Sequence, residues 1–384
     1  MKPLKTTEFF LPHDSSNPTK LIGGESSFDR LGEEVAAIRP KAVLVVMGRE
    51  SFRKSSFYQK LEKMLNNYEM VEASAIDENP RQQFLQDEMN RLAEFSYDLV
   101  IAIGGGSVLD AAKLFALSAN EADRNLFTWM EPGWKPAQKP VPLIAIPTTA
   151  GSGSEVTPFA SIETFDLKKV TLCSTAFYPK VAIVDPRLTW SMPPYISAST
   201  GFDAISQAIE SFWSIHATPE SKKIALWSVG NLKNALEKAV SDPENQEARA
   251  KMAAGSCAAG LAIARTKTTA VHSVSYPITT HFGVAHGHAC ALTLPSFIRF
   301  NGEALKETGA PLLRALGVPS YDAAARFLES LMDEIKLQRK LSDLNISEEG
   351  IELIVREGFR PDRIKNNPRE VTAESLRAIL RNIY

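Results

Sequence analysis

Three apolar runs in the first half of the chain constrain its fold more than any other feature. They are "KAVLVVMG" (41–48), "YDLVIAIG" (97–104) and "VPLIAIP" (141–147), each bounded by Gly or Pro. Continuous apolar runs of this length are typical of parallel strands that are covered on both faces. Between the first two runs, the segments "FYQKLEKMLNN" and "RQQFLQDEMNRLAEF" have helical spacing. The pattern predicts βαβ units and an α/β fold with a mostly parallel sheet.

The pattern changes after the three apolar runs. Residues 160–185 alternate in polarity, which predicts a hairpin that leads into one last strand. Helical patterns then follow one another, and two of them open at Thr218 and Thr372, which are suitable helix caps. A chain of 384 residues is also too long for one ordinary core. We therefore expect a nucleotide-binding α/β domain over 1–190 and an all-helical domain over 191–384.

The composition excludes several classes of protein. A formal charge of -2 gives no long-range attraction to nucleic acid or to an acidic membrane. The three cysteines lack paired spacing, which argues against a disulfide framework and favours a reducing cytoplasm. The opening residues lack the apolar stretch of a signal peptide, and no run reaches membrane-spanning length.

Two polar loops follow predicted strands and can bind phosphate. The first is "GGGS", between a strand and a helix, where free backbone N–H groups attract a phosphate. The second is "IPTTAGSGSEVT", which follows the next strand. For the first loop, the alternative is a plain tight turn. For Asp110, in the helix that follows this loop, the alternative is a favourable position in the helix dipole. The cofactor-binding candidates of this region are Gly105, Gly106, Ser107, Asp110, Thr148, Thr149, Ser152 and Lys169.

A carboxylate and two histidines can form a metal site in the helical half. Asp203 and Gln207 are four residues apart in "GFDAISQAIES", so a helix presents both from one face. His272 and His286 are separated by a segment with Pro277 and Gly283, where a loop can bring the two imidazoles together. One carboxylate, one amide oxygen and two imidazoles can hold a divalent cation. The alternative is a set of buried histidines with ordinary hydrogen bonds.

The chain as a whole resembles the group III, iron-containing alcohol dehydrogenases of the dehydroquinate synthase-like superfamily. The matching segments are "GGGSVLDAAK", "IPTTAGSGSEVT", "KVAIVDPRLTWSMPP", "GFDAISQAIES", "HSVSYPITTHFGVAHGHA" and "NNPREVTAESLRAIL". The resemblance implies a nucleotide-binding domain, a helical domain and an active site in the cleft between them. It also implies hydride transfer between a nicotinamide cofactor and an aldehyde or alcohol at a divalent metal, with Fe²⁺ expected first and Zn²⁺ or Mn²⁺ as alternatives.

The resemblance also assigns the site residues. The metal aspartate falls on Asp203 and two metal histidines fall on His272 and His286, but the third falls on Gln207. An amide oxygen is a weaker ligand than imidazole for iron or zinc, so we expect lower metal affinity. A further histidine of the family that is implicated in catalysis falls on Tyr276, which can still donate a proton. The catalytic candidates are thus Asp203, His272 and Tyr276. His281 and His288 are expected to line, support or cap the site.

The end of the first apolar run bears on the cofactor. Many family members have an acid there for the adenosine ribose, whereas this chain has Gly48, followed by Arg49 and Arg53. Loss of a carboxylate and gain of cations suit a 2′-phosphate, so we expect NADP(H) to be preferred over NAD(H). The alternative is an ordinary solvated helix start.

The segment "LAIARTKTTAVH" bears on the substrate. Arg265 and Lys267 stand where relatives have small or apolar residues, which favours an anionic substrate, and we include Lys267 among the catalytic candidates. With Gln207 and Tyr276, the pattern is similar to the phosphonoacetaldehyde reductase branch of the family. The alternative is that Arg265 and Lys267 form structural salt bridges.

The expected function is reduction of a small anionic aldehyde to its alcohol, in a cytoplasmic homodimer that binds neither nucleic acid nor membrane. Two other functions compete with it. One is a lyase or cyclase like dehydroquinate synthase, and the other is a nucleotide-binding relative that has lost catalysis.

Overall fold

The computed structural model describes residue 14 and residues 16–384. Within the opening segment, whose residues predicted no signal peptide, residues 1–13 and 15 lie outside the described residues. The described chain divides into two units. The first consists of 16–149 and 154–189, and the second of residue 14, 150–153 and 190–384.

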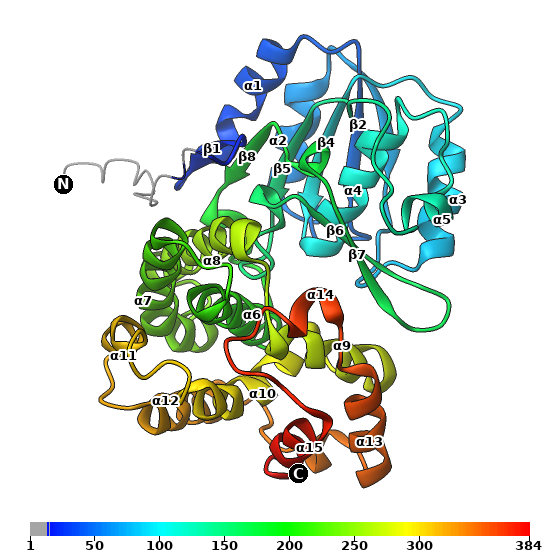
Figure 1. The fold of residues 1–384 in the computed structure, drawn as a ribbon. Helices are drawn as coiled ribbons and strands as arrows, with labels where there is room; N and C mark the ends of the chain where they lie inside the picture. Colours follow the sequence, from blue (N-terminus) through cyan, green and yellow to red (C-terminus); the bar gives the residue numbers. More distant parts are fainter. Residues whose placement is uncertain (1–13, 15) are drawn as a thin grey trace, which may run out of the picture. The chain divides into compact units, whose positions relative to one another are not determined.

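The first unit contains a six-stranded parallel sheet in the order β1-β8-β5-β4-β2-β3 (Figure 1). Of its four inner strands, β2, β4 and β5 are the predicted apolar runs and β8 is the strand predicted after the hairpin, so the expected α/β fold is confirmed. The short strands β1 and β3 escaped the sequence analysis, because β1 has four residues and β3 is a half-exposed edge strand with acidic residues. The strands are β1 Lys20–Gly23, β2 Ala42–Met47, β3 Glu69–Ala73, β4 Leu99–Gly104, β5 Leu143–Pro147 and β8 Val181–Val184.

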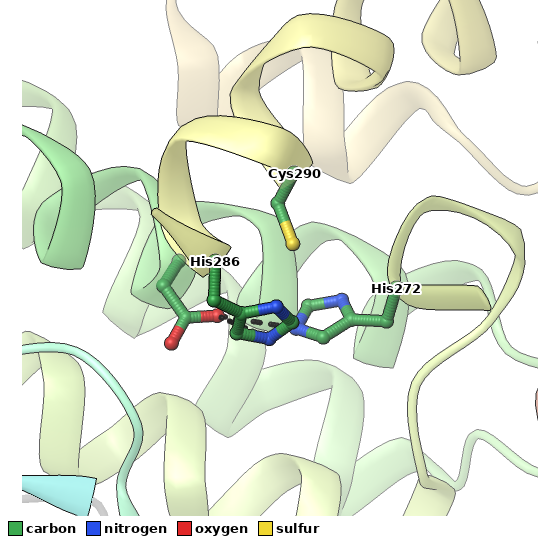
Figure 2. Close-up of side chains that lie close together, drawn as sticks. His272, His286 and Cys290 are labelled. Carbon is green, nitrogen blue, oxygen red and sulfur yellow. Dashed lines mark hydrogen bonds and ion pairs between the residues drawn. The ribbon is translucent and has the colours of Figure 1, made fainter. Parts of the chain in front are cut away.

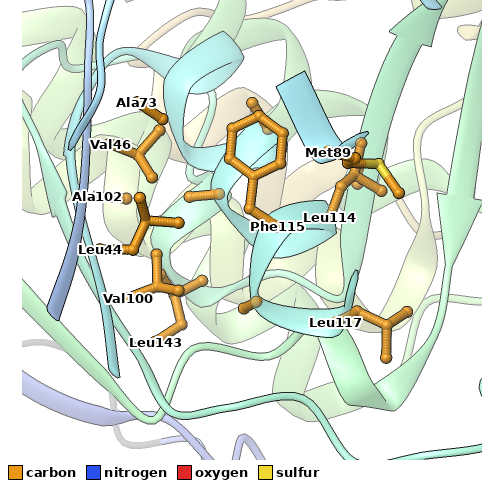
Figure 3. Close-up of a cluster of buried hydrophobic side chains, with 14 of the residues drawn as sticks. Leu44, Val46, Ala73, Met89, Val100, Ala102, Leu114, Phe115, Leu117 and Leu143 are labelled. Atoms are coloured by element: carbon orange, nitrogen blue, oxygen red, sulfur yellow. The ribbon is translucent and has the colours of Figure 1, made fainter. Parts of the chain in front are cut away.

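Helices cover both faces of this sheet. On one face, side chains of α3 and α4 pack on alternate residues of β2 and β4, and Figure 3 shows Leu114 and Phe115 opposite Leu44 and Val100. On the other face, α1 and α2 pack on the remaining residues of the same strands. Burial on both faces explains why these strands are apolar throughout. The helices are α1 Leu31–Ile38, α2 Ser56–Leu65, α3 Gln82–Leu92, α4 Gly106–Ser118 and α5 Leu126–Trp129.

The predicted hairpin is also present. Strands β6 (Phe159–Glu163) and β7 (Lys169–Cys173) are antiparallel, and the chain then enters β8 as the sequence analysis expected.

The second unit is helical over its described residues. Helix α6 is buried along most of its length and contacts α7, α8, α9 and α10, so it is the central helix of the unit. Thr218 and Thr372 cap α7 and α15 as predicted, each with a serine three residues later. Among the described residues, no helix is long and apolar enough to cross a membrane. The helices are α6 Pro194–Trp213, α7 Pro219–Ser241, α8 Gln246–Thr266, α9 Ala270–Phe282, α10 His286–Asn301, α11 Ala310–Leu316, α12 Tyr321–Glu334, α13 Glu348–Glu357, α14 Pro361–Ile364 and α15 Ala373–Arg381.

Candidate metal centre

One face of the central helix carries three polar side chains. Asp203, Gln207 and Glu210 lie on α6 at spacings of four and three residues, so they share a face, and all three are buried. Burying a carboxylate is unfavourable unless charges or hydrogen-bond donors surround it. The groups that surround this face therefore determine its chemistry.

A glycine lets α10 approach this face closely. A Cβ atom on Gly287 would lie 1.9 Å from the carbonyl oxygen of Ser199 and 3.0 Å from Cβ of Asp203, so any side chain there would separate α10 from α6. The close approach brings His286, the first residue of α10, beside the aspartate. Its Nε2 lies 3.9 Å from Oδ1 of Asp203.

Helix α9 supplies the second histidine. His272 Nε2 lies 3.2 Å from Oδ1 of Asp203. The connection to α10 differs from the sequence interpretation, because α9 continues through Pro277 and ends at Phe282. A proline ring removes one helical hydrogen bond but does not end this helix. The turn is confined to 283–285 and begins at Gly283, whose φ of 68° suits a glycine.

Glu210 fixes the orientation of His272. One carboxylate oxygen accepts hydrogen bonds from the backbone N–H of Thr269 (3.0 Å) and Val271 (2.9 Å) and from the Thr269 hydroxyl (2.7 Å). The other contacts Nδ1 of His272, which leaves Nε2 to face Asp203. Such a carboxylate fixes the tautomer of a metal-binding histidine and strengthens it as a ligand. The sequence analysis missed Glu210, although an acid in a largely apolar helix seven residues after Asp203 was a usable signal.

Four potential ligand atoms gather at this point. Atoms of Asp203, His272, His286 and Cys290 all lie within 4.8 Å of one another. Figure 2 shows the Cys290 thiol directed toward the two labelled imidazole rings. The sequence analysis missed Cys290 too, although it lies four residues after His286 and therefore on the same helical face.

The surroundings of this cluster shift the pKa values of two of its residues. Burial lowers the pKa of His272, but the neighbouring Cys290, Glu210 and Asp203 raise it, and the net pKa lies well above the ordinary value. Burial also raises the pKa of the Cys290 thiol, against an opposing effect of His272. Metal ligands must lose their protons, so binding of a cation here would be coupled to proton release.

Gln207 lies at the edge of the cluster. Its Nε2 donates to Oδ1 of Asp203 (3.2 Å) and, at 3.4 Å, to the carbonyl of Ser152, while its Oε1 is buried without a hydrogen-bond partner. A buried acceptor without a donor is rare in proteins. The four-residue cluster beside Gln207, with one carboxylate, two imidazoles and one thiol, has the donor types that a divalent ion needs.

The remaining candidates of the helical half lie around the cluster or away from it. The Tyr276 ring stacks on His286, with centroids 5.6 Å apart. His281 Nε2 contacts Glu357 at 2.7 Å, and His288 contacts the Tyr195 hydroxyl and the carbonyl of Gln338. Burial lowers the pKa of His288. Neither of these two histidines is part of the four-residue cluster.

Arg265 and Lys267 are the two cations that were expected to bind an anionic substrate. Arg265 pairs with Asp14, and its Nε donates to Oδ2 at 2.9 Å. Lys267 is exposed and follows the last residue of α8 with a φ of 56°. These positions favour the structural salt bridge for Arg265 and give no support to a catalytic role for Lys267.

The two phosphate-binding loops begin on neighbouring strands of the first unit. Gly104 and Pro147 are paired in register at the ends of β4 and β5, and the N–H of Thr148 donates to the carbonyl of Gly104 at 3.0 Å. A Cβ atom on Gly105 would contact the Thr149 side chain at 3.4 Å. Gly106 opens helix α4, so this edge presents the helix N-terminus that the sequence analysis assigned to phosphate.

Three other cofactor candidates have defined partners. The Asp110 carboxylate accepts from the Ser154 hydroxyl (2.6 Å) and the Ser161 N–H (2.9 Å), which joins α4 to the hairpin. Lys169 Nζ donates to Asn79 at 3.2 Å, and the Ser107 hydroxyl accepts from the N–H of the same asparagine. Asp110 thus has a structural role that the sequence did not show, and Ser152 is grouped with the second unit.

The close approach at Gly287 gives a direct prediction. Gly287→Ala should push α10 away from α6, cost about 1–3 kcal/mol of stability and lower Zn²⁺ affinity at least about tenfold. Calorimetric Zn²⁺ titration and thermal unfolding measure both effects. The matched control is Gly230→Ala in α7, where no atom lies within 4 Å of the added Cβ. It should stabilise the protein by about 0.5–1 kcal/mol and leave Zn²⁺ affinity unchanged. Wild-type affinity in Gly287→Ala would contradict the role of this contact.

Comparison with protein families covers nearly the whole chain. Residues 18–186 match the family "Iron-containing alcohol dehydrogenase", and residues 197–384 match "Fe-containing alcohol dehydrogenase family, C-terminal".

Individual relatives agree with this result. The chain is 33% identical over 294 residues to long-chain-alcohol dehydrogenase 1 of Geobacillus thermodenitrificans, covering 74% of each chain. It is 37% identical over 212 residues to phosphonoacetaldehyde reductase of Streptomyces viridochromogenes, covering 53% of each. A solved structure of sulfoacetaldehyde reductase from Bifidobacterium kashiwanohense in complex with NAD⁺ superimposes with a TM-score of 0.90 at 34% identity, covering 96% of this chain and 98% of the other. The two family matches cover most of the chain, and the relatives agree with them. This protein is therefore a member of the iron-containing alcohol dehydrogenase family and an enzyme of the oxidoreductase class.

Proposed function

We propose that the protein is an NADPH-dependent reductase of a short aldehyde that carries an acidic group. The observation that supports this most is that two arginines, Arg360 and Arg363, lie against the Tyr276 ring. The same ring stacks on His286, a candidate metal ligand. The proposal keeps the anionic substrate expected from the sequence but assigns it to different residues.

Both guanidinium groups lie against the same aromatic ring. Arg360 Cζ is 5.5 Å and Arg363 Cζ is 5.7 Å from the centroid of the Tyr276 ring. The other neighbour of that ring is His286, at 5.6 Å between centroids. Two cations therefore lie one aromatic ring away from a candidate ligand of the metal cluster.

The two arginines differ in exposure. Arg363 is buried and donates to the Thr268 hydroxyl at 3.0 Å, whereas the Arg360 side chain is partly exposed. Asp362 is an acid near both, at 3.7 Å from Arg360 Nε and 3.9 Å from Arg363 Nε, and the negative charge of Glu210 also acts on Arg363. Guanidinium groups are well suited to bind a phosphonate, sulfonate or carboxylate.

The residues of the cluster have complementary roles in this proposal. Asp203, His272 and His286 hold the divalent metal, which when bound supplies a Lewis acid that polarises a carbonyl oxygen. Glu210 orients His272. The Tyr276 hydroxyl is our candidate for the proton donor to the product oxygen, directly or through water.

Two relatives support the substrate class. One is named phosphonoacetaldehyde reductase and one sulfoacetaldehyde reductase, and both names denote a two-carbon aldehyde with an acidic group. The homodimeric state and cytoplasmic location expected from the sequence stay predictions.

We predict that Arg360→Gln and Arg363→Gln selectively impair reduction of charged aldehydes. A charge-assisted hydrogen bond contributes about 1.5–3 kcal/mol, so kcat/KM for phosphonoacetaldehyde should fall about ten- to a hundredfold. The value for propanal, which has no charge, should be nearly unchanged. Steady-state rates with both substrates, measured for each variant, test this.

Arg265→Gln is the matched control, because Arg265 pairs with Asp14. It should change the two rates by the same factor. The assignment is wrong if the variants at Arg360 and Arg363 lower both rates equally, or if Arg265→Gln is the variant that discriminates.

We also propose that NADP(H) is preferred over NAD(H). The end of β2 carries Gly48 where a ribose-binding acid would stand, and Arg49 follows it. In the structure Arg49 pairs with Asp77 (2.6 Å) and Arg53 with Glu72. The Arg49–Asp77 pair is more than half exposed, and such pairs contribute only about 0–1 kcal/mol, so a phosphate can compete for this arginine.

The cofactor proposal predicts that NADPH exceeds NADH by at least about tenfold in kcat/KM, or about 1.4 kcal/mol. Gly48→Asp should move the preference toward NADH. A side chain fits there, since the nearest atoms to an added Cβ are 3.8 and 4.0 Å away. Lys54→Gln, which removes an exposed cation paired with Glu50, is the control and should not change the ratio. Equal use of both cofactors by the wild type would refute the preference.

A further inference from the structure

We propose that Cys290 is a ligand of the divalent metal, and that its thiolate takes the position that the family gives to a histidine on α6 and that this chain fills with Gln207. The proposed set is Asp203, His272, His286 and Cys290. It rests on the metal chemistry of the family and is independent of the anionic substrate.

The first support is position. Cys290 follows His286 by four residues on α10, so both side chains point from one helical face, and Cys290 is fully buried. Its sulfur belongs to the group of ligand atoms that lie within 4.8 Å of one another. Ligand atoms around a tetrahedral Zn²⁺ are roughly 3.3–3.8 Å apart for ordinary bond lengths. Side-chain movements of about an ångström would close the set around an ion.

The second support is the orientation of the Gln207 amide group. Its amide nitrogen donates to the Asp203 carboxylate and faces the cluster, while its oxygen is buried without a hydrogen-bond partner. In this orientation Gln207 supports a ligand and does not itself coordinate. The family resemblance implies four protein ligands, so the fourth donor comes from elsewhere, and the Cys290 sulfur is the remaining ligand atom in the group.

The third support is the polarity of the surroundings. A buried free cysteine usually behaves as a small apolar residue. The Cys290 sulfur instead lies among ligand atoms of one carboxylate, Asp203, and two imidazoles, His272 and His286. Cys257 on α8 is equally buried and does not belong to the ligand group, so it provides a matched control within the same unit.

Thiolate ligation has chemical consequences. The S–H bond breaks as the sulfur–metal bond forms, and the proton goes to solvent, with no change in oxidation state. Asp203 and the thiolate together neutralise a divalent ion. A soft sulfur donor also favours Zn²⁺ and Co²⁺ over Mn²⁺.

Cobalt tests the proposal, because a thiolate bound to Co²⁺ gives a charge-transfer absorption in the near ultraviolet. Full-length protein loaded with Co²⁺ should show this band, and Cys257→Ser should keep it. Cys290→Ser should lose the band and release about one proton fewer per ion bound. Its Zn²⁺ affinity should fall at least about tenfold, with a smaller loss for Mn²⁺. Turnover is not part of the readout, so a wild type that shows the band but does not reduce anionic aldehydes would refute the proposed function alone.

X-ray absorption of the zinc-loaded wild type provides a second measurement that needs no variant. It should show one sulfur neighbour at about 2.3 Å. This result keeps the proposal testable even if Cys290→Ser folds poorly. A wild type that binds no Co²⁺, a cobalt protein without the band, a band that survives Cys290→Ser, or a zinc shell without sulfur would each overturn the proposal.

Discussion

The buried carboxylate of Glu210 is the interaction on which the candidate metal centre depends. It lies in the last turn of α6 and is fully buried, so it must be satisfied by protein groups. It caps the first turn of α9 by accepting from backbone N–H groups, where a negative charge is also favoured by the helix dipole. The same carboxylate contacts His272. One residue thus anchors α9 to α6 and fixes the ring that faces Asp203.

The rest of the centre follows from this contact and from the approach of α10. With α9 anchored, Tyr276 lies one turn after His272 and stacks on His286 of α10. Arg360, which precedes α14, and Arg363, within α14, lie against the same ring. A polar stripe on one buried helix therefore organises the metal ligands, the candidate proton donor and the cations through contacts within the second unit.

Much of this arrangement could be predicted from the sequence, and the limits have physical reasons. The inner strands were predictable because burial on both faces requires unbroken apolar runs, whereas β1 and β3 were not, since edge strands are short or half exposed. Asp203, His272 and His286 could be named from spacing and family resemblance. Glu210 and Cys290 had only their spacing from Asp203 and His286 as a signal, and their roles depend on partners that lie on other helices. Cations for an anionic substrate were sought next to His272 in sequence, whereas the proposed ones, Arg360 and Arg363, reach Tyr276 from about ninety residues away.

The central claim is that α6, α9 and α10 build one metal centre. Anomalous diffraction at the zinc edge, from crystals of the zinc-loaded enzyme, tests it most directly. The account predicts a single strong peak bonded by Asp203, His272 and His286. A peak bound instead at His281 or His288, or no peak near Asp203 in protein shown to contain stoichiometric zinc, would contradict the account.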